Sequence, residues 1–308
     1  MENNELNEAE NTEFNENNIN YYFKQKKAYI HDYKLIKNIG FDKYGKLLLV
    51  SYNINELLDK KLYVMEKIEV KSSKLKSEII KKMDVLKNIN SKYINKVYDY
   101  YFVKEEGKCF AFILMDYCEK GDLNQIIYET NYLNQRTIWR IFIQIVQGLK
   151  SLFSNNIILK SLTTLNILID KKNNAKIGRF DIIYDFVDEY LFQENENLLS
   201  YVSPEILNGL PYTNKCIVWS LGCILYELVF KNKAFNYFDN NIKIEIQRFE
   251  IPDNCGINFK IFLSKLLCEE QNRLTINEII YNGIVKNQLI DNNLFDEILK
   301  DKNKVKGK

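Results

Sequence analysis

The chain has 308 residues, of which 46% are hydrophobic and 27% charged, and its formal net charge is +2 at pH 7. A chain of this length and composition can bury the core of one large or two small domains. Lysine and arginine are spread along the sequence and balanced by acids, so the charge pattern gives no reason to expect nucleic-acid binding.

The cysteine pattern and the first residues bear on where the protein works. The six cysteines form no C-x-x-C pair, which favours reduced thiols. The start of the chain is polar and acidic, unlike a signal peptide, and no apolar run is long enough to span a membrane. We therefore expect an intracellular protein, cytoplasmic or nuclear, that does not bind membranes.

The first half of the chain reads as a short tail followed by strands. Residues 1–25 are rich in Asn and Glu with few large apolar side chains, so we expect a disordered tail. Alternating apolar residues and turn signals then predict strands at 33–40, 46–53, 60–68, 97–103 and 108–115. Helical spacing predicts one helix over residues 77–89, between the third and fourth strands.

The second half is mostly helical. Apolar residues at helical spacing predict helices over residues 133–153, 216–230, 259–268 and 276–281. A short hairpin, ILID…AKIG, lies between the first two of them, followed by a long irregular segment up to Pro204. We expect one domain over residues 26–290, with a strand-rich lobe at about 33–116, a helical lobe at about 117–290, and a basic tail at 291–308.

Several short motifs occur in a characteristic order. They are IGFDKYG (39–45), YVMEKI (63–68), LMDYCEKGDL (114–123), LKSLTTLNILI (159–169), GRFD (178–181), YVSPEIL (201–207), PYTNKCIVWSLGCILYEL (211–228) and Arg273. With this series, the sequence resembles a eukaryotic protein kinase domain, most closely the serine/threonine NIMA-related type. The resemblance implies an α+β bilobal fold, with an antiparallel sheet and one helix in the N-terminal lobe and a larger helical C-terminal lobe.

The residues that carry the family's reaction are replaced. Alternation along the third strand places Glu66, not Lys67, where the resemblance implies the phosphate-binding lysine. The helix glutamate that holds this lysine falls on Lys82. The D-F-G aspartate falls on Arg179, and the H-R-D aspartate that accepts the substrate proton falls on Ser161.

Two neighbouring positions of the catalytic loop complete the comparison. Thr163 is a poor substitute for a general base, and Asn166 matches the metal-binding asparagine but would be a feeble magnesium ligand alone. No catalytic group is therefore expected to be intact, and we expect no metal site. The family geometry would place Glu66 between Lys82 and Arg179, as a compensated network of inverted charges. Random drift after loss of activity is the alternative reading.

A weak nucleotide site is left open. Leu47, Val64 and Leu168 match the apolar walls of an adenine pocket, and Met115, Asp116 and Cys118 are counted with them as residues of this possible pocket. Asp42 replaces the middle glycine of the loop that covers the phosphates, which opposes close approach of phosphate. We expect no cofactor, although weak binding of ATP without magnesium stays open.

Other matched positions are structural. The resemblance implies that Glu205 and Arg273 tie the end of the activation segment to the late helices. It also implies an apolar column through both lobes, made of Leu86, Val97, Leu159 and Phe180, and Ile217 stands where the family has an aspartate. Phosphorylation of Tyr184, Tyr190, Ser200 or Tyr201 is left open.

These replacements indicate a pseudokinase that acts as a binding, scaffolding or allosteric module. The alternative is an atypical ATP-dependent phosphotransferase, or another transferase, with relocated groups such as Lys43, Lys46 or Asp181. By family analogy, the partner is a protein, such as an active kinase or a cell-division or cytoskeletal complex.

Overall fold

The computed structural model describes residues 33–41, 45–52, 61–180, 196–235 and 256–294. They form two compact units. The first unit contains the described residues up to Asn90 together with Asn95–Tyr117, and the second contains Ser91–Ile94 and the described residues from Cys118 onward. Each unit has its own core of buried apolar residues.

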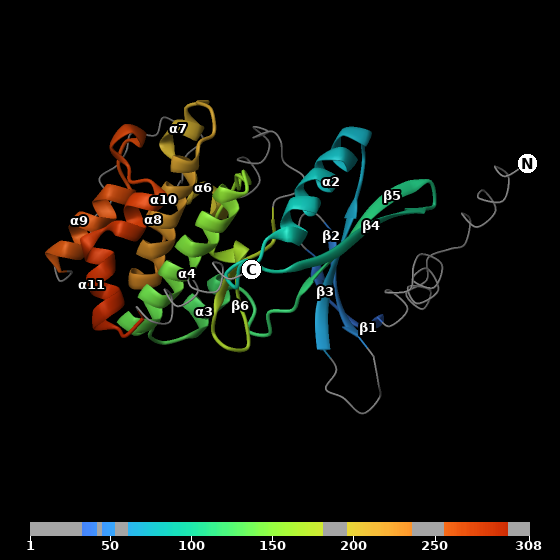
Figure 1. The fold of residues 1–308 in the computed structure, drawn as a ribbon, viewed down its shortest axis with the longest axis horizontal. Coiled ribbons are helices and arrows are strands. Elements are labelled where there is room, and N and C mark those ends of the chain that lie inside the picture. Colours follow the sequence, from blue (N-terminus) through green and yellow to red (C-terminus); the bar gives the residue numbers. More distant parts are fainter. Residues whose placement is uncertain (1–32, 42–44, 53–60, 181–195, 236–255, 295–308) are drawn as a thin grey trace, which may run out of the picture. The chain divides into compact units, whose positions relative to one another are not determined.

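The first unit is an antiparallel sheet with one helix (Figure 1). Its strands lie in the order β1-β2-β3-β5-β4. Helix α2 (Ser73–Asn88) follows β3 and packs on β4 through a buried stripe that includes Ile79, Met83 and Leu86. The strands are β1 (Tyr33–Phe41), β2 (Gly45–Tyr52), β3 (Lys61–Glu69), β4 (Val97–Glu105) and β5 (Lys108–Asp116).

Strand alternation gives the sheet a hydrophobic cluster on one face. Tyr63 and Met65 of β3 are buried there with Phe112 of β5, next to partly buried residues such as Tyr101. The ring of Tyr101 stacks on that of Phe112 with centroids 5.4 Å apart. The register of β3 therefore decides which side chains face this cluster, and a shift by one residue would exchange the two faces.

The second unit is helical, with one small hairpin (Figure 1). Its larger helices are α3 (Leu123–Glu129), α4 (Gln135–Ser154), α8 (Asn214–Phe230), α9 (Ile257–Leu266), α10 (Ile276–Tyr281) and α11 (Gly283–Asp291). Strands β6 (Ile167–Ile169) and β7 (Ala175–Ile177) form the hairpin. The short helical turns are η2 (Thr164–Asn166), α6 (Glu196–Leu199), α7 (Pro204–Leu207) and η3 (Glu270–Asn272).

Two local features place the hairpin beside α4. Gly148 of α4 lies so close to Ile177 that a Cβ atom there would approach a side-chain carbon of Ile177 to 2.9 Å. The amide of Ile177 also donates a hydrogen bond to the carbonyl oxygen of Tyr93 (2.9 Å). The end of β7, and with it the start of the GRFD motif, is therefore fixed against the helical core.

The fold class predicted from the sequence is confirmed, with differences at element ends. Helix α2 begins at Ser73 rather than at residue 77, because the Ser72 side chain caps it by accepting a hydrogen bond from the amide of Leu75. Helices α3 and α11 were not predicted. Asn282 is both the C-cap of α10 and the N-cap of α11. The two helices therefore follow each other without a loop that would mark a second helix in the sequence.

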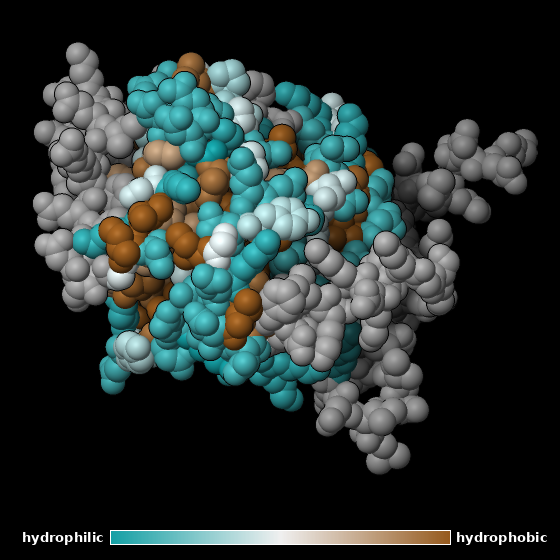
Figure 2. All heavy atoms as spheres, turned by 60° about the vertical axis from the view of Figure 1, so that its left-hand side comes forward, coloured by the Kyte–Doolittle hydropathy of each residue, from teal (hydrophilic) through white to brown (hydrophobic). Residues whose placement is uncertain are grey.

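The surface of the second unit gives no large apolar patch on the face that Figure 2 shows, where apolar spots are separated by hydrophilic side chains. Exposed apolar residues of this unit include Ile257, Ile261, Tyr281 and Ile290. Scattered residues of this kind are common on soluble domains. Among the described helices, none combines the length and the apolar character that crossing a membrane requires.

Candidate functional site

The motif LKSLTTLNILI (159–169) contains a turn, the catalytic-loop turn, that Thr163 and Asn166 hold together. The amide and the hydroxyl of Thr163 both donate hydrogen bonds to Oδ1 of Asn166, at 3.0 and 2.9 Å. The amide of Leu165 in turn donates to Oγ1 of Thr163 at 3.2 Å. Both side chains are buried, so the amide oxygen of Asn166 is already committed to the turn.

Asn166 also joins this turn to the GRFD motif. Its Nδ2 donates to the carbonyl oxygen of Arg179 (3.1 Å), and its carbonyl accepts from the amide of Gly178 (2.8 Å). Arg179 has a φ of +46°, in the left-handed region that residues other than glycine adopt at a cost. The hydrogen bonds made by Asn166 hold the backbone on both sides of this conformation.

The guanidinium of Arg179 lies beside an acid of the same unit. Its Nη2 is 3.6 Å from Oδ2 of Asp122, and the two side chains are 33% and 16% exposed. Asp122 also caps α3, accepting from the amide of Gln125 at 2.9 Å. Sequence reasoning did not single out Asp122, although its place directly before a helix was a signal for a capping residue.

Glu66 and Lys67 lie on opposite faces of β3. Glu66 is 4% exposed. Lys67 pairs with Glu105 (Nζ to Oε2, 2.6 Å), and its ammonium group lies 4.2 Å from the centre of the Phe110 ring. The cation therefore faces the hydrophobic cluster around Phe112, and the buried anion is on the face where the resemblance implies the phosphate-binding lysine.

The residues of the predicted network of inverted charges belong to different units. Lys82 is a half-buried residue of α2, between the buried Ile79 and Leu86, and belongs with Glu66 to the first unit. Arg179 belongs to the second unit, where Asp122 is its described partner. The contact of Glu66 with Arg179 stays a prediction.

The predicted adenine pocket is also divided between the units. Leu47, Val64, Met115 and Asp116 lie on β2, β3 and β5, and Val64 is the cross-strand neighbour of Met115. Cys118 and Leu168 belong to the second unit, so the pocket stays a prediction. Asp42 and Lys43, like Asp181, lie outside the described residues.

One side chain of the predicted pocket has a described partner. Asp116 accepts a hydrogen bond from the hydroxyl of Tyr98 at 2.6 Å. Burial, together with this hydrogen bond, raises the pKa of Tyr98 to about 12. The Asp116 carboxylate at the end of β5 is thus hydrogen-bonded to a tyrosine of the neighbouring strand β4.

The apolar positions are buried in both units. Leu86 and Val97 are each 1% exposed in the first unit, and Leu159 and Phe180 are 3% and 4% exposed in the second. Ile217, where the family has an aspartate, is fully buried in α8. These residues belong to the cores of their own units, and the predicted column through both units stays a prediction.

Glu205 and Arg273 form a bidentate ion pair in the second unit. Nη1 and Nη2 of Arg273 lie 2.5 and 3.0 Å from the two carboxylate oxygens of Glu205. The guanidinium also lies over the Trp219 ring, 5.0 Å from its centre. Burial alone would raise the pKa of Glu205, but the hydrogen bonds and charge of Arg273 outweigh burial and lower it.

A second buried cluster, which sequence reasoning missed, surrounds Glu227 of α8. Its carboxylate accepts from the hydroxyls of Tyr201 (2.5 Å) and Tyr128 (3.0 Å) and from Lys233 Nζ (2.7 Å). The Tyr201 hydroxyl also contacts Thr164 of the catalytic-loop turn at 2.8 Å. The sequence did contain a signal for this cluster, because Glu227 is the one acid within the apolar run of α8 and a buried charge needs partners.

This cluster bears on the phosphorylation of Ser200 and Tyr201, which the sequence left open. They are 5% and 3% exposed. Burial and the neighbouring Glu227 raise the pKa of Tyr201 well above its usual value. A kinase could reach either hydroxyl only after this segment opens. Tyr184 and Tyr190 lie outside the described residues.

Comparison with known proteins shows which protein family this chain resembles. Residues 33–283 match the model of the protein kinase domain. The "Serine/threonine-protein kinase Nek3" of Oryza sativa subsp. japonica is 28% identical over 214 residues, covering 68% of this chain and 35% of that protein. The "Probable serine/threonine-protein kinase nek2" of Dictyostelium discoideum is 25% identical over 263 residues, covering 80% of this chain and 61% of that protein.

A third relative, the "NUAK family SNF1-like kinase 2" of Homo sapiens, is 28% identical over 216 residues, covering 70% of this chain and 33% of that protein. The chain thus spans less than two thirds of the length of these relatives. Because the family model accounts for residues 33–283, the chain belongs to the protein kinase family, with NIMA-related serine/threonine kinases among its relatives.

Proposed function

We propose that this chain is a pseudokinase, a kinase-fold binding module that does not transfer phosphate. The observation that carries the proposal is the state of Arg179, which stands at the D-F-G aspartate position. Its guanidinium lies beside Asp122, and its carbonyl is bound by Asn166. A cation held in this way is the opposite of the metal-binding acid that the reaction needs.

The donor set of this region does not fit a magnesium ion. Magnesium prefers carboxylate oxygen and water ligands in octahedral geometry. Among the described residues of this region, the amide oxygen of Asn166 accepts two hydrogen bonds from Thr163, and the Asp122 carboxylate lies beside the guanidinium of Arg179. We therefore propose that any nucleotide binds weakly and without magnesium.

The lost groups act together in the family's reaction. Ser161 stands where an aspartate would accept the substrate proton, and Glu66 stands where a lysine would hold the phosphates. Catalytic groups that work as a unit fail as a unit, and losing one of them can cost several orders of magnitude in rate. With these positions replaced, the chemistry has neither its base nor its charge stabilisation.

The second unit contains a framework of buried polar contacts that supports a binding role. The Glu205–Arg273 pair and the Glu227 cluster tie residues 201–205 to α8 and to the segment that follows α9. We propose that this framework presents a protein-binding surface inside the cell. By family analogy, the partner is an active kinase or a cell-division or cytoskeletal complex.

A phosphate-transfer assay tests the proposal. The full chain is incubated with ATP labelled in its γ-phosphate, generic protein substrates, and either Mg²⁺ or Mn²⁺. We expect no transfer above that of a heat-inactivated sample. Transfer by the wild type that is lost in Asp181→Asn, but kept in the matched control Asp188→Asn, would instead support a transferase with relocated groups.

A further inference from the structure

Tyr128 of α3 is an exposed residue whose hydroxyl contacts a buried acid. Tyr128 is 47% exposed, and its hydroxyl donates to Oε1 of Glu227 at 3.0 Å. Glu227 is fully buried in α8. Glu129 and Tyr132, which follow Tyr128 in the chain, are exposed as well. One hydrogen bond therefore joins the surface at the end of α3 to the interior of the second unit.

Lys233 is shared by the groups around Glu227. Its Nζ donates to Oε1 of Glu227 at 2.7 Å and to the Tyr201 hydroxyl at 2.5 Å. The same ammonium group lies 4.6 Å from the centre of the Tyr201 ring and 5.9 Å from that of the Tyr128 ring. Lys233 thus supplies a positive charge that compensates the buried carboxylate, and it lies beside both tyrosines.

The same cluster holds the Tyr201 segment, defined as residues 199–203. The Tyr201 hydroxyl donates to Oε2 of Glu227 and contacts the Thr164 hydroxyl of the catalytic-loop turn at 2.8 Å. The Ser220 hydroxyl of α8 donates to the carbonyl oxygen of Tyr201 at 2.8 Å. A change in the charge around Glu227 would therefore act on this segment and on the turn beside it.

A phosphate on Tyr128 would change that charge. At pH 7 a phosphotyrosine carries about −1.5 to −2 charges and offers strong hydrogen-bond acceptors in place of the hydroxyl donor. It would repel the Glu227 carboxylate and attract Lys233. Lys231 offers a second cation, because its Nζ donates to the carbonyl oxygen of Thr130 directly after α3.

We propose that Tyr128 is a phosphorylation site for a separate tyrosine kinase, and that its phosphate releases the Tyr201 segment from α8. The kinase transfers the γ-phosphoryl group of ATP to Oη of Tyr128, with ADP as the leaving group and loss of the hydroxyl proton. The phosphate then pairs with Lys233, so the Glu227 carboxylate loses its cation and one of its donors. A buried charge without its partner is costly, and the contacts of the Tyr201 segment weaken.

Tyr132 is a matched control on the same surface. It lies four residues after Tyr128 and is 77% exposed. Among the described residues, it makes no hydrogen bond with Glu227, Tyr201 or Lys233. A phosphate on Tyr132 therefore adds the same charge outside the cluster.

The first experiment asks whether a kinase can reach Tyr128. The folded full chain is incubated with ATP, magnesium and a tyrosine kinase of broad specificity, and mass spectrometry locates the phosphate. We expect phosphotyrosine at position 128, with the urea-denatured chain as the positive control. Phosphate at position 128 in the denatured chain but not in the folded one would overturn the proposal.

The second experiment asks whether the phosphate releases the segment. Full chains carrying phosphotyrosine only at position 128, or only at position 132, are produced by genetic incorporation. The amides of Tyr201 and Val202 donate to carbonyl oxygens three residues earlier in the chain. They should exchange hydrogen about tenfold faster with phosphate at position 128, because exchange reports local opening. Phosphate at position 132 should leave their exchange unchanged.

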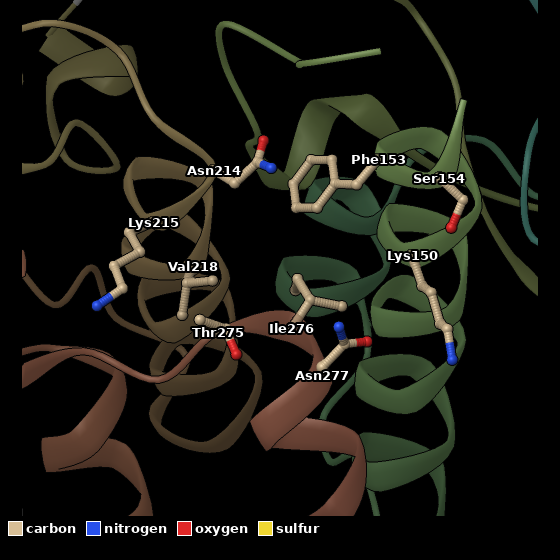
Figure 3. Close-up of a pocket in the computed structure, with 9 residues that line it drawn as sticks. All are labelled: Lys150, Phe153, Ser154, Asn214, Lys215, Val218, Thr275, Ile276 and Asn277. Carbon is tan, nitrogen blue, oxygen red and sulfur yellow. The ribbon is translucent and has the colours of Figure 1, made fainter. Parts of the chain in front are cut away.

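The end of α4 provides an internal reference. It lines a pocket of about 280 Å³ with the first turns of α8 and α10, and Figure 3 shows Lys150 and Phe153 of α4 on the other side of this pocket from Val218 of α8. No member of the Glu227 cluster is among the described residues that line the pocket. The amides of residues 150–154 should therefore keep their exchange rates in both phosphorylated chains.

Three exchange results would overturn the proposal. They are an unchanged rate in the Tyr201 segment, equal acceleration by phosphate at positions 128 and 132, and faster exchange that includes residues 150–154. The last result would mean that the phosphate unfolds the unit rather than releasing one segment. None of these readouts measures phosphate transfer by the chain itself, so they are independent of the pseudokinase proposal.

Discussion

Two arginine–carboxylate pairs of the second unit differ in almost every physical respect. Arg273 has a fully buried side chain and holds Glu205 through two hydrogen bonds, at 2.5 and 3.0 Å. Arg179 is one third exposed and approaches Asp122 at 3.6 Å. The resemblance assigns the first pair to the family's structural framework, and it assigns Arg179 of the second pair to the position of the family's metal-binding acid.

The difference in burial and distance indicates that the two pairs contribute differently to stability. A buried charge without its partner is costly, so the Glu205–Arg273 pair is tied to stability. The Arg179–Asp122 pair is loose and partly hydrated, so it adds little to stability. The buried pair thus holds the helices together, while the weaker pair contains the arginine on which the proposed loss of phosphate transfer depends.

The largest expected effect is that of Arg273→Ala. This change leaves the Glu205 carboxylate buried without its partner, and we expect it to lower the free energy of unfolding by about 3–5 kcal/mol. Urea denaturation of the purified chain measures the change. Arg136→Ala, at an exposed position of α4, is the control and should change stability by less than about 0.5 kcal/mol. A loss below 1 kcal/mol for Arg273→Ala would remove the contrast between the two pairs.

The next effect concerns the Glu227 cluster. Tyr201→Phe removes a buried donor to the carboxylate, so we expect a loss of about 1–3 kcal/mol in the free energy of unfolding. Tyr128→Phe removes a donor to the same carboxylate from a residue that is 47% exposed, so its loss should be smaller. Equal losses in the two variants would mean that burial does not set the strength of these contacts.

Acid titration should separate the buried pair from the rest of the chain. The folded-state pKa of Glu205 is lowered, so its contribution to stability is present above the unfolded pKa of about 4.3 and is lost as pH falls through the folded value. Between pH 5 and pH 3, the wild type should therefore lose more stability than Glu205→Gln. Parallel curves of unfolding free energy against pH would contradict the assignment.

The smallest effect is that of Arg179. Arg179→Ala should cost less than about 1 kcal/mol, and a double-mutant cycle with Asp122→Asn should give a coupling of about 0.2–1 kcal/mol. Because φ at this position is +46°, Arg179→Gly should be at least as stable as Arg179→Ala. A coupling above 2 kcal/mol would show that this pair is as strong as a buried one.

Much of the architecture could be predicted from the sequence, because local periodicity reports it. Alternation along β3 was enough to separate Glu66 from Lys67, and the apolar run of α8 marked a buried helix. Element ends were less accurate because capping decides them. The start of α2 depends on the Ser72 side chain, which adds no apolar signal.

The partners at the site were harder to predict, because they are distant in sequence. Asp122 meets Arg179, and Tyr201 meets Glu227, only after the helices have packed. Spacing within a motif carries no information about such contacts. The resemblance to kinases predicts which positions differ from the family, but it does not predict which side chains contact them.

The most direct test of the pseudokinase account is the thermal unfolding midpoint of the full chain with ATP, with ATP plus magnesium, and with neither. A ligand that binds only the folded state raises the midpoint according to its concentration and affinity. The account predicts that magnesium adds nothing, because Asn166 and Arg179 offer it no site. A rise in the midpoint that requires both ATP and magnesium would contradict the account.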